Sequence, residues 1–176
     1  RGEKVEPLPE WKDWRPRIVL LKPSFGVSTP DAYRRWSGSR ELPGIPYGEQ
    51  DVGGHVLVND LERPVFEKHL FLAEMKRWLV GRPGVRGAMM SGSGSTMFAV
   101  VEDEGAGRAL MEELFHRMQE RKVRVIHLDV RLSNTPARNL YESLGFVQDG
   151  LRKGYYDLPK EDAVLMSRTD ESVPKR

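Results

Sequence analysis

The sequence contains no cysteine among its 176 residues. This absence excludes disulfide bonds, thiolate metal ligands and a cysteine nucleophile together. Apolar runs are also short: none approaches the roughly 20 residues that a membrane-spanning helix needs, and no charged-then-apolar leader is present. We therefore expect a cytoplasmic protein without a membrane partner.

Neither sign of charge dominates the chain. Lysine and arginine number 28 against 26 aspartate and glutamate residues, so the formal net charge is only +2. This balance argues against a nucleic-acid partner, and we expect no metal site. The chain begins with Arg1 instead of methionine, so we expect a fragment or a processed product.

The pattern of apolar residues predicts short strands that alternate with amphipathic helices, and this favours an α+β fold. We expect strands at 18–21, 97–101 and 123–130, helices at 30–36, 61–80, 105–122 and 135–144, and two antiparallel strands near 146 and 163–166 around a loop at 157–161. Thr29 is expected to cap the first helix, and residues 37–54 are expected to form a surface loop without a core element. The strands at 97–101 and 123–130 could belong to one sheet through a right-handed crossover.

One stretch, Gly87 to Val101, organises the middle of the chain. Its centre is a run of glycine and hydroxyl residues from Ser91 to Thr96, set between two apolar flanks. Alternate glycines free the backbone to turn and let its N–H groups approach a ligand, and the hydroxyls add donors, so the run suits a phosphate or another anion. The alternative is an ordinary tight turn.

Four segments resemble, in order, the motifs of one enzyme family. They are RGEKVEPL at 1–8, KPSFGVSTPDAYRRW at 22–36, VNDLERPVFEKH at 58–69 and MSGSGSTMFAV at 90–100. Together they are similar to the 4-diphosphocytidyl-2-C-methyl-D-erythritol kinases of the GHMP kinase superfamily, over about residues 1–102. The resemblance implies a GHMP-kinase C-terminal-like sheet with helices on one face, and ATP-dependent phosphorylation of a cytidine-linked methylerythritol in non-mevalonate isoprenoid synthesis.

The same resemblance implies particular binding residues. It places ATP with Mg beside the turn, where the phosphates lie near Gly92, Ser93, Gly94, Ser95 and Thr96. It brings Tyr33 near the cytosine; the alternative is an aromatic side chain packed under the loop. The family's main ATP loop and catalytic aspartate precede the RGE motif, at which this chain begins. Because phosphoryl transfer depends on positioning and on metal-bound phosphates, we predict no kinase activity for this chain alone.

The second half resembles a different family. The segments IHLDVRLSNTPARNLYESLGF at 126–146 and LRKGYYDLPKEDAVLM at 151–166 look like the C-terminal half of a GNAT acetyltransferase of the type that acetylates ribosomal-protein N-termini, over about residues 105–168. The resemblance implies transfer of acetyl from acetyl-CoA to a protein N-terminal amine. It makes Asp129 the base and Tyr141 the acid, and it places Asn134 against coenzyme A. Close relatives carry glutamate where Asp129 stands.

The coenzyme loop departs from the family pattern. Gly105, Gly107 and Arg108 keep part of the motif whose helix N-terminus binds pyrophosphate, but three acidic residues at 102–104 stand where the family has an arginine and a glycine. Carboxylates beside a pyrophosphate oppose its binding, so we expect neither cofactor to bind tightly.

The two resemblances predict a GHMP-kinase-like region at 1–104, a GNAT-like region at 105–168 and a disordered tail at 169–176. Three functions remain open. The chain is a kinase-family hybrid that is inactive alone, an acetyltransferase, or a non-catalytic hybrid that binds a nucleotide or a protein N-terminus without turnover. The kinase resemblance covers more residues and motifs, so it ranks first for identity. The oligomeric state is not indicated.

Overall fold

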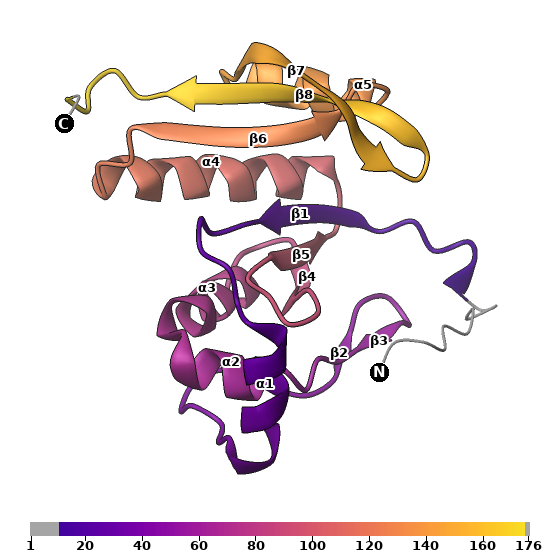
Figure 1. Ribbon diagram of the computed structural model, residues 1–176, viewed down its shortest axis with the longest axis vertical. Helices are drawn as coiled ribbons and strands as arrows, with labels where there is room; N and C mark the ends of the chain where they lie inside the picture. Colours follow the sequence, from indigo (N-terminus) through magenta and orange to yellow (C-terminus); the bar gives the residue numbers. More distant parts are fainter. Residues whose placement is uncertain (1–10, 175–176) are drawn as a thin grey trace. The chain divides into compact units, whose positions relative to one another are not determined.

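The computed structural model describes residues 11–174, so the first kinase motif, at 1–8, lies outside the described residues. The fold is mixed α/β, and each strand pair in it is antiparallel (Figure 1). The chain divides into two compact units, residues 1–111 and 112–176. Helix α4, Glu104–Glu120, crosses this division and confirms the helix expected at 105–122. No helix in the described part is long and apolar enough to cross a membrane.

The first unit is built on a three-stranded sheet. Strands β1, Arg17–Leu21, β4, Val85–Met90, and β5, Met97–Val101, pair in the order β1-β5-β4. Its other elements are α1, Thr29–Arg35, the 3₁₀ helix η2, Trp36–Gly38, the short strands β2, Gln50–Asp51, and β3, Val56–Leu57, and the helices α2, Glu62–Lys68, and α3, Leu70–Val80. The strands expected at 18–21 and 97–101 are confirmed.

The core of the first unit lies between one face of this sheet and the helices. Met90, Met97 and Ala99 from the sheet and Phe66 and Leu72 from α2 and α3 belong to one buried cluster. The apolar residues of the helical segment are periodic because they face this core. Burying each large side chain there stabilises the fold by about 1.5–3 kcal/mol.

The single helix expected at 61–80 is wrong in one respect. The chain leaves the helical conformation at His69, whose φ and ψ are −120° and 71°, and the segment forms α2 and α3 separately. The ring of Phe25 stacks on the His69 imidazole at 5.5 Å between centroids. A one-residue break leaves both apolar stripes facing the same sheet, so periodicity could not reveal it.

Two further expectations for the first unit are corrected. The helix α1 is capped by Ser28, whose Oγ accepts a hydrogen bond from the Asp31 N–H at 3.4 Å, and not by Thr29. The segment 37–54 is not free of core residues, because Ile45 and Val52 are buried. A sequence without period can still bury single apolar side chains at a bend.

Side chains close the outer edge of β4. The Gln50 amide bonds both backbone groups of Ala88, each at 2.9 Å. At Met90, the N–H donates to Glu62 Oε1 at 2.8 Å and the carbonyl accepts from Asn59 Nδ2 at 2.6 Å. These bonds satisfy edge groups that would otherwise pair with another strand.

The second unit is built on its own three-stranded sheet. Strands β6, Val125–Arg131, β7, Val147–Asp157, and β8, Lys160–Thr169, pair in the order β6-β8-β7, and α5, Thr135–Ser143, links the first two. The antiparallel hairpin of β7 and β8 is confirmed. Buried Phe146, Val164 and Met166 form its centre with Phe115 of α4.

Strand β6 pairs with β8 along seven residue pairs, and the crossover that would join the strands at 97–101 and 123–130 in one sheet stays a prediction. One expectation fails in this unit. The tail is ordered at its start: Thr169 ends β8, and the Asp170 N–H donates to the Arg124 carbonyl at 2.7 Å. Residues 175 and 176 lie outside the described range.

Candidate functional site

The Gly/Ser run forms the tight turn between β4 and β5. The Ser91 N–H donates to the Thr96 carbonyl at 2.8 Å, and the Gly94 N–H donates to the Ser91 carbonyl at 2.9 Å. Gly92 and Gly94 have φ angles of +55° and +83°, in the left-handed region that favours glycine. The alternating glycines therefore have a structural reason in the turn itself.

Side chains from distant segments hold this turn in place. Buried Ser95 accepts a hydrogen bond from Lys22 Nζ at 2.7 Å and donates to the Phe25 carbonyl. The hydroxyls of Ser93 and Thr29 are 2.6 Å apart, and Asn59 Nδ2 donates to the Gly92 carbonyl at 2.8 Å. Two hydroxyls expected to face a phosphate thus bond within the protein.

Sequence reasoning missed Lys22 and Asn59 as partners of the turn. Asn59 Oδ1 accepts from the Leu61 N–H at 3.0 Å, which is a local contact just before α2. Its second role, toward residues about thirty positions later, leaves no local signal. The ATP role of Gly92, Ser93, Gly94, Ser95 and Thr96 stays a prediction.

Tyr33 lies on α1 and is 63% exposed. The alternative that it packs under the loop is therefore wrong, and its proximity to a cytosine stays a prediction. On the same helix, the Asp31 carboxylate accepts from Lys68 Nζ at 2.7 Å and Arg34 Nη2 at 2.8 Å. These hydrogen bonds, that from Lys68 first, lower the pKa of Asp31 to about 2.

The start of α4 is occupied by the chain's own acidic residue. Asp103 Oδ1 accepts from the Ala106 N–H at 2.8 Å, and the Asp103 carbonyl accepts from the Gly107 N–H at 3.2 Å. Gly105, Gly107 and Arg108 lie in the first two turns of this helix. A carboxylate thus takes one of the N–H groups at the start of this helix, and the role of Gly105, Gly107 and Arg108 toward the coenzyme's pyrophosphate stays a prediction.

Tyr141, on α5, is half-buried beside Phe146, with ring centroids 5.8 Å apart. Burial raises the pKa of its phenol, and the neighbouring Tyr156 raises it further. The phenol therefore keeps its proton at neutral pH, as an acid must.

Asp129 lies on β6, and a third of its side-chain surface is exposed. Its Oδ2 accepts from Arg152 Nη1 at 3.4 Å. Burial raises the pKa of Tyr156, and the charge of Asp129 is the next cause. Tyr156 therefore lies within electrostatic range of both Asp129 and Tyr141.

A second set of bonds joins the start of α5 to the β7–β8 turn. Glu161 accepts from the Ser133 N–H at 2.5 Å and from Arg131 Nη1 at 3.3 Å, and the bonds from Ser133 lower its pKa. Arg131 also lies over the Tyr156 ring at 4.0 Å. The Tyr-Tyr and Glu-Asp-Ala motifs signalled this region, and the register pairs Tyr156 with Glu161.

Asn134 begins α5, and its Oδ1 accepts from the Ala137 N–H at 3.2 Å. Its position at the helix start is confirmed, whereas its contact with coenzyme stays a prediction. Within residues 11–174, no group of three or more histidine, aspartate or glutamate side chains could hold a metal ion.

Comparison with protein-family models finds two matches in different parts of the chain. Residues 51–120 match the C-terminal model of the GHMP kinases. Residues 101–146 match the GNAT acetyltransferase family. The two matches overlap at 101–120, which includes the whole of α4.

Individual relatives agree with this division. The chain is 39% identical over 120 residues to a 4-diphosphocytidyl-2-C-methyl-D-erythritol kinase of Syntrophotalea carbinolica, covering 65% of the chain and 40% of the kinase. It is 40% identical over 80 residues to the ribosomal protein bS18-alanine N-acetyltransferase of Escherichia coli K12, covering 42% of the chain and 54% of that enzyme.

Among solved structures, the ribosomal-protein-S18-alanine N-acetyltransferase of Escherichia coli matches 45% of this chain and 52% of its own, with 37% identity and a TM-score of 0.39. The chain spans about half or less of each curated relative named here. Both resemblances drawn from the motifs are therefore confirmed, each for its own part of the chain: one to the C-terminal part of GHMP kinases and one to GNAT acetyltransferases.

Proposed function

We propose that the second unit is the acceptor side of an N-acetyltransferase-type site that binds a protein N-terminal amine. The carrying observation is the partly exposed carboxylate of Asp129 on β6, with Tyr156 within electrostatic range of it and of Tyr141. In this proposal, residues 1–104 are a region related to the C-terminal part of GHMP kinases, with a sheet of that type. Residues 105–168 follow as a GNAT-like half.

The chemistry of an amine acceptor suits these side chains. An incoming N-terminal ammonium is attracted by the partly exposed Asp129 carboxylate, which can also take its proton. Tyr141, with its raised pKa, holds a proton that it can donate. Because Asp103 occupies the start of α4, we propose that the chain binds amines but transfers little or no acetyl.

Binding of a short peptide with a free N-terminal alanine tests the acceptor site. We expect saturable changes in the NMR signals of Tyr141 and Tyr156, and about tenfold weaker binding by Asp129→Asn, because a charge-assisted contact is lost. Glu120→Gln, at the exposed end of α4, removes the same charge outside this group; it is the control and should bind normally. Equal binding of the same peptide with an acetylated N-terminus would overturn the proposal.

Asp103 variants test the coenzyme side separately. In thermal unfolding, we expect acetyl-CoA to leave the wild-type midpoint unchanged and to raise that of Asp103→Ala, because a ligand that binds only the folded state stabilises it. Asp103→Asn keeps an acceptor oxygen but removes the charge, and should show a smaller rise. Each variant is compared with itself without ligand. A clear rise of the wild-type unfolding midpoint with acetyl-CoA would contradict the proposal that Asp103 opposes coenzyme binding at the start of α4.

The kinase-like turn supports a second candidate, a nucleotide site. The observation that favours it is Lys22, whose ammonium lies beside Ser95 and could pair with a phosphate. CDP, or ATP with Mg, should then raise the unfolding midpoint of wild type but not of Lys22→Met, without turnover of the cytidine substrate. No shift with any nucleotide, coenzyme or amine would favour the non-catalytic hybrid.

A further inference from the structure

The face of the second sheet that carries Asp129 is built from rows of residues across β6, β8 and β7. The register places Asp129 and Gly150 on either side of Leu165. In the next row, Arg152 is paired with Ala163. Residues two apart on a strand point to the same face of a sheet, so both rows form one surface. Arg152 on β7 therefore lies diagonally across β8 from Asp129.

Small residues leave room on this surface. Arg152 reaches across β8, where Ala163 presents only a methyl group, and its Nη1 donates to Asp129 Oδ2 at 3.4 Å. Gly150 has no side chain in the row of Asp129. Apart from its chain neighbours, no heavy atom of the described chain lies within 4 Å of where a Cβ would stand at Gly150. The sheet therefore leaves open space in the row of Asp129, on the side where Arg152 stands.

The contact between Arg152 and Asp129 is long and exposed. Charge-assisted hydrogen bonds are typically about 2.7–2.9 Å long, whereas this one is 3.4 Å, and the two side chains are 52% and 33% exposed. Because exposed ion pairs contribute little free energy, an arriving ammonium can displace Arg152 from the carboxylate at small cost. The guanidinium also lies over the exposed ring of Tyr155, 4.9 Å from the centroid, and this keeps it near the site.

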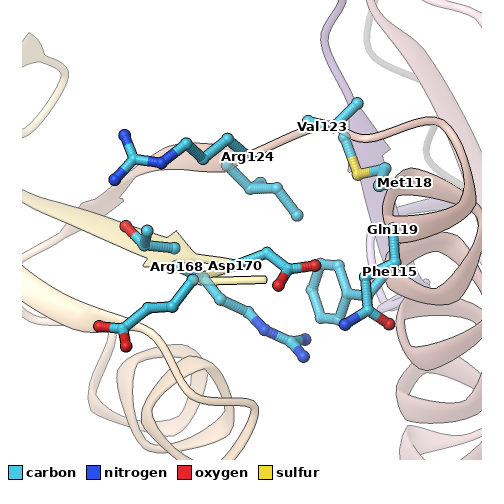
Figure 2. Close-up of a pocket in the computed structure, with 10 residues that line it drawn as sticks. Phe115, Met118, Gln119, Val123, Arg124, Arg168 and Asp170 are labelled. Carbon is cyan, nitrogen blue, oxygen red and sulfur yellow. The ribbon is translucent and has the colours of Figure 1, made fainter. Parts of the chain in front are cut away.

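The opposite face of the same sheet packs against α4 and contains a cavity of about 120 Å³ (Figure 2). Its lining includes Ile126 and its register partner Arg168, together with Arg124 and, from α4, Phe115. Ile126 is three residues before Asp129, so the two side chains point to opposite faces of β6. The surface around Asp129 is therefore separate from this cavity.

We propose that Arg152 determines specificity, so that the site prefers protein N-termini whose second residue is acidic. This inference rests on the proposed amine acceptor. The N-terminal ammonium takes the place of Arg152 at Asp129, and the displaced guanidinium pairs with the carboxylate of the next residue. Consecutive Cα atoms are about 3.8 Å apart, so an acid directly after the amine stays close to Arg152. A planar guanidinium can bind such a carboxylate through two N–H groups.

Titration of the full chain with matched short peptides, followed by NMR, tests this preference. The peptides begin with Ala-Glu, Ala-Gln or acetylated Ala-Glu and are otherwise identical. We expect the Ala-Glu peptide to bind about three- to tenfold more tightly than the Ala-Gln peptide, because it gains one charge-assisted contact at an exposed site. Equal affinities of these two peptides, both lost on acetylation, would overturn the role of Arg152 and leave the amine acceptor intact. Equal binding of the acetylated peptide, or no saturable binding, would overturn both.

Two variants assign the preference to one side chain. In Arg152→Gln, the Ala-Glu and Ala-Gln peptides should bind equally, and the Ala-Gln peptide should bind at least as tightly as it does to wild type, because Asp129 has lost a competing partner. Arg124→Gln removes the same charge from the opposite face of the sheet and is the matched control, which should keep the wild-type preference. The circular dichroism of each variant checks that it folds. A preference for Ala-Glu that survives in folded Arg152→Gln would contradict the assignment.

Discussion

The two units use their polar side chains in opposite ways. In the first unit they bond to one another: Lys22 donates a hydrogen bond to the Ser95 hydroxyl, and Glu62 and Lys76 form an ion pair in the core. In the second unit, the side chains of Asp129 and Tyr141 are partly exposed, and Asp129 makes one long contact, with Arg152 at 3.4 Å. The glycine and serine motif at 91–96 thus serves as a turn, whereas polar groups that can still bind a ligand are those that the protein itself leaves partly exposed.

The largest expected effect concerns the core ion pair of the first unit. Both side chains are almost fully buried, and burial raises the pKa of Glu62 although Lys76 opposes this. Lys76→Met leaves a carboxyl without its partner, and we expect the first unit to lose about 3–5 kcal/mol of unfolding free energy. Urea unfolding by tryptophan fluorescence measures this, because all four tryptophans precede residue 112.

The double variant Glu62→Gln with Lys76→Met separates charge from packing. Its amide keeps an acceptor for the Met90 N–H without a buried charge, so we expect most of the lost stability to return. Lys68→Met, which removes an exposed ion pair, is the control and should cost less than about 1 kcal/mol. If Lys76→Met lost as little unfolding free energy as Lys68→Met, the buried ion pair would not be a source of stability in the first unit.

One asparagine in each unit gives an intermediate effect. Asn59 bonds the Met90 and Gly92 carbonyls and the Leu61 N–H, so we expect Asn59→Ala to cost about 2–3 kcal/mol. Asn134 caps only α5, and its replacement by alanine should cost about 1 kcal/mol. Tryptophan fluorescence follows the first variant and near-ultraviolet tyrosine dichroism the second. Equal losses would contradict the tighter bonding of the first unit.

The smallest effect is a pH dependence on the surface of the first unit. The pKa of Asp31 is lowered from 3.8 to about 2 by Lys68 and Arg34, so its contribution is present above about pH 4 and is lost as the pH falls toward 2. In Lys68→Met, the pKa of Asp31 should rise toward 3.8. Carboxyl NMR signals followed through a pH titration measure both values. An unchanged pKa in the variant would mean that Lys68 is not the main cause.

Most elements could be predicted from the sequence because their signals are local. The cap and closing glycine of α5 lie within one turn of the helix, and the hairpin of β7 and β8 follows from two strand patterns around a loop. The break at His69 could not be predicted, because it leaves the apolar stripe on the same side. Ile45 and Val52 were missed because single buried residues have no period.

The candidate sites were only partly predictable. The motifs indicated Asp129 and Tyr141, but the position of Tyr156 depends on the register that sets β7 beside β8. The acidic residues at 102–104 are expected to oppose pyrophosphate, and only the structure shows that the Ala106 N–H donates to Asp103 there. Matches to both families overlap at 101–120, which includes α4.

The sequence by itself determined the alternation of strands and helices, the glycine turn and the two family resemblances. Only the tertiary structure decided that β6 pairs with β8, that Lys76 and Glu62 meet in the core, and that Ser95 bonds Lys22. The physical reason is range. Periodicity, caps and turns act between residues a few positions apart, whereas strand pairing, desolvation and pKa shifts arise between residues that folding brings together.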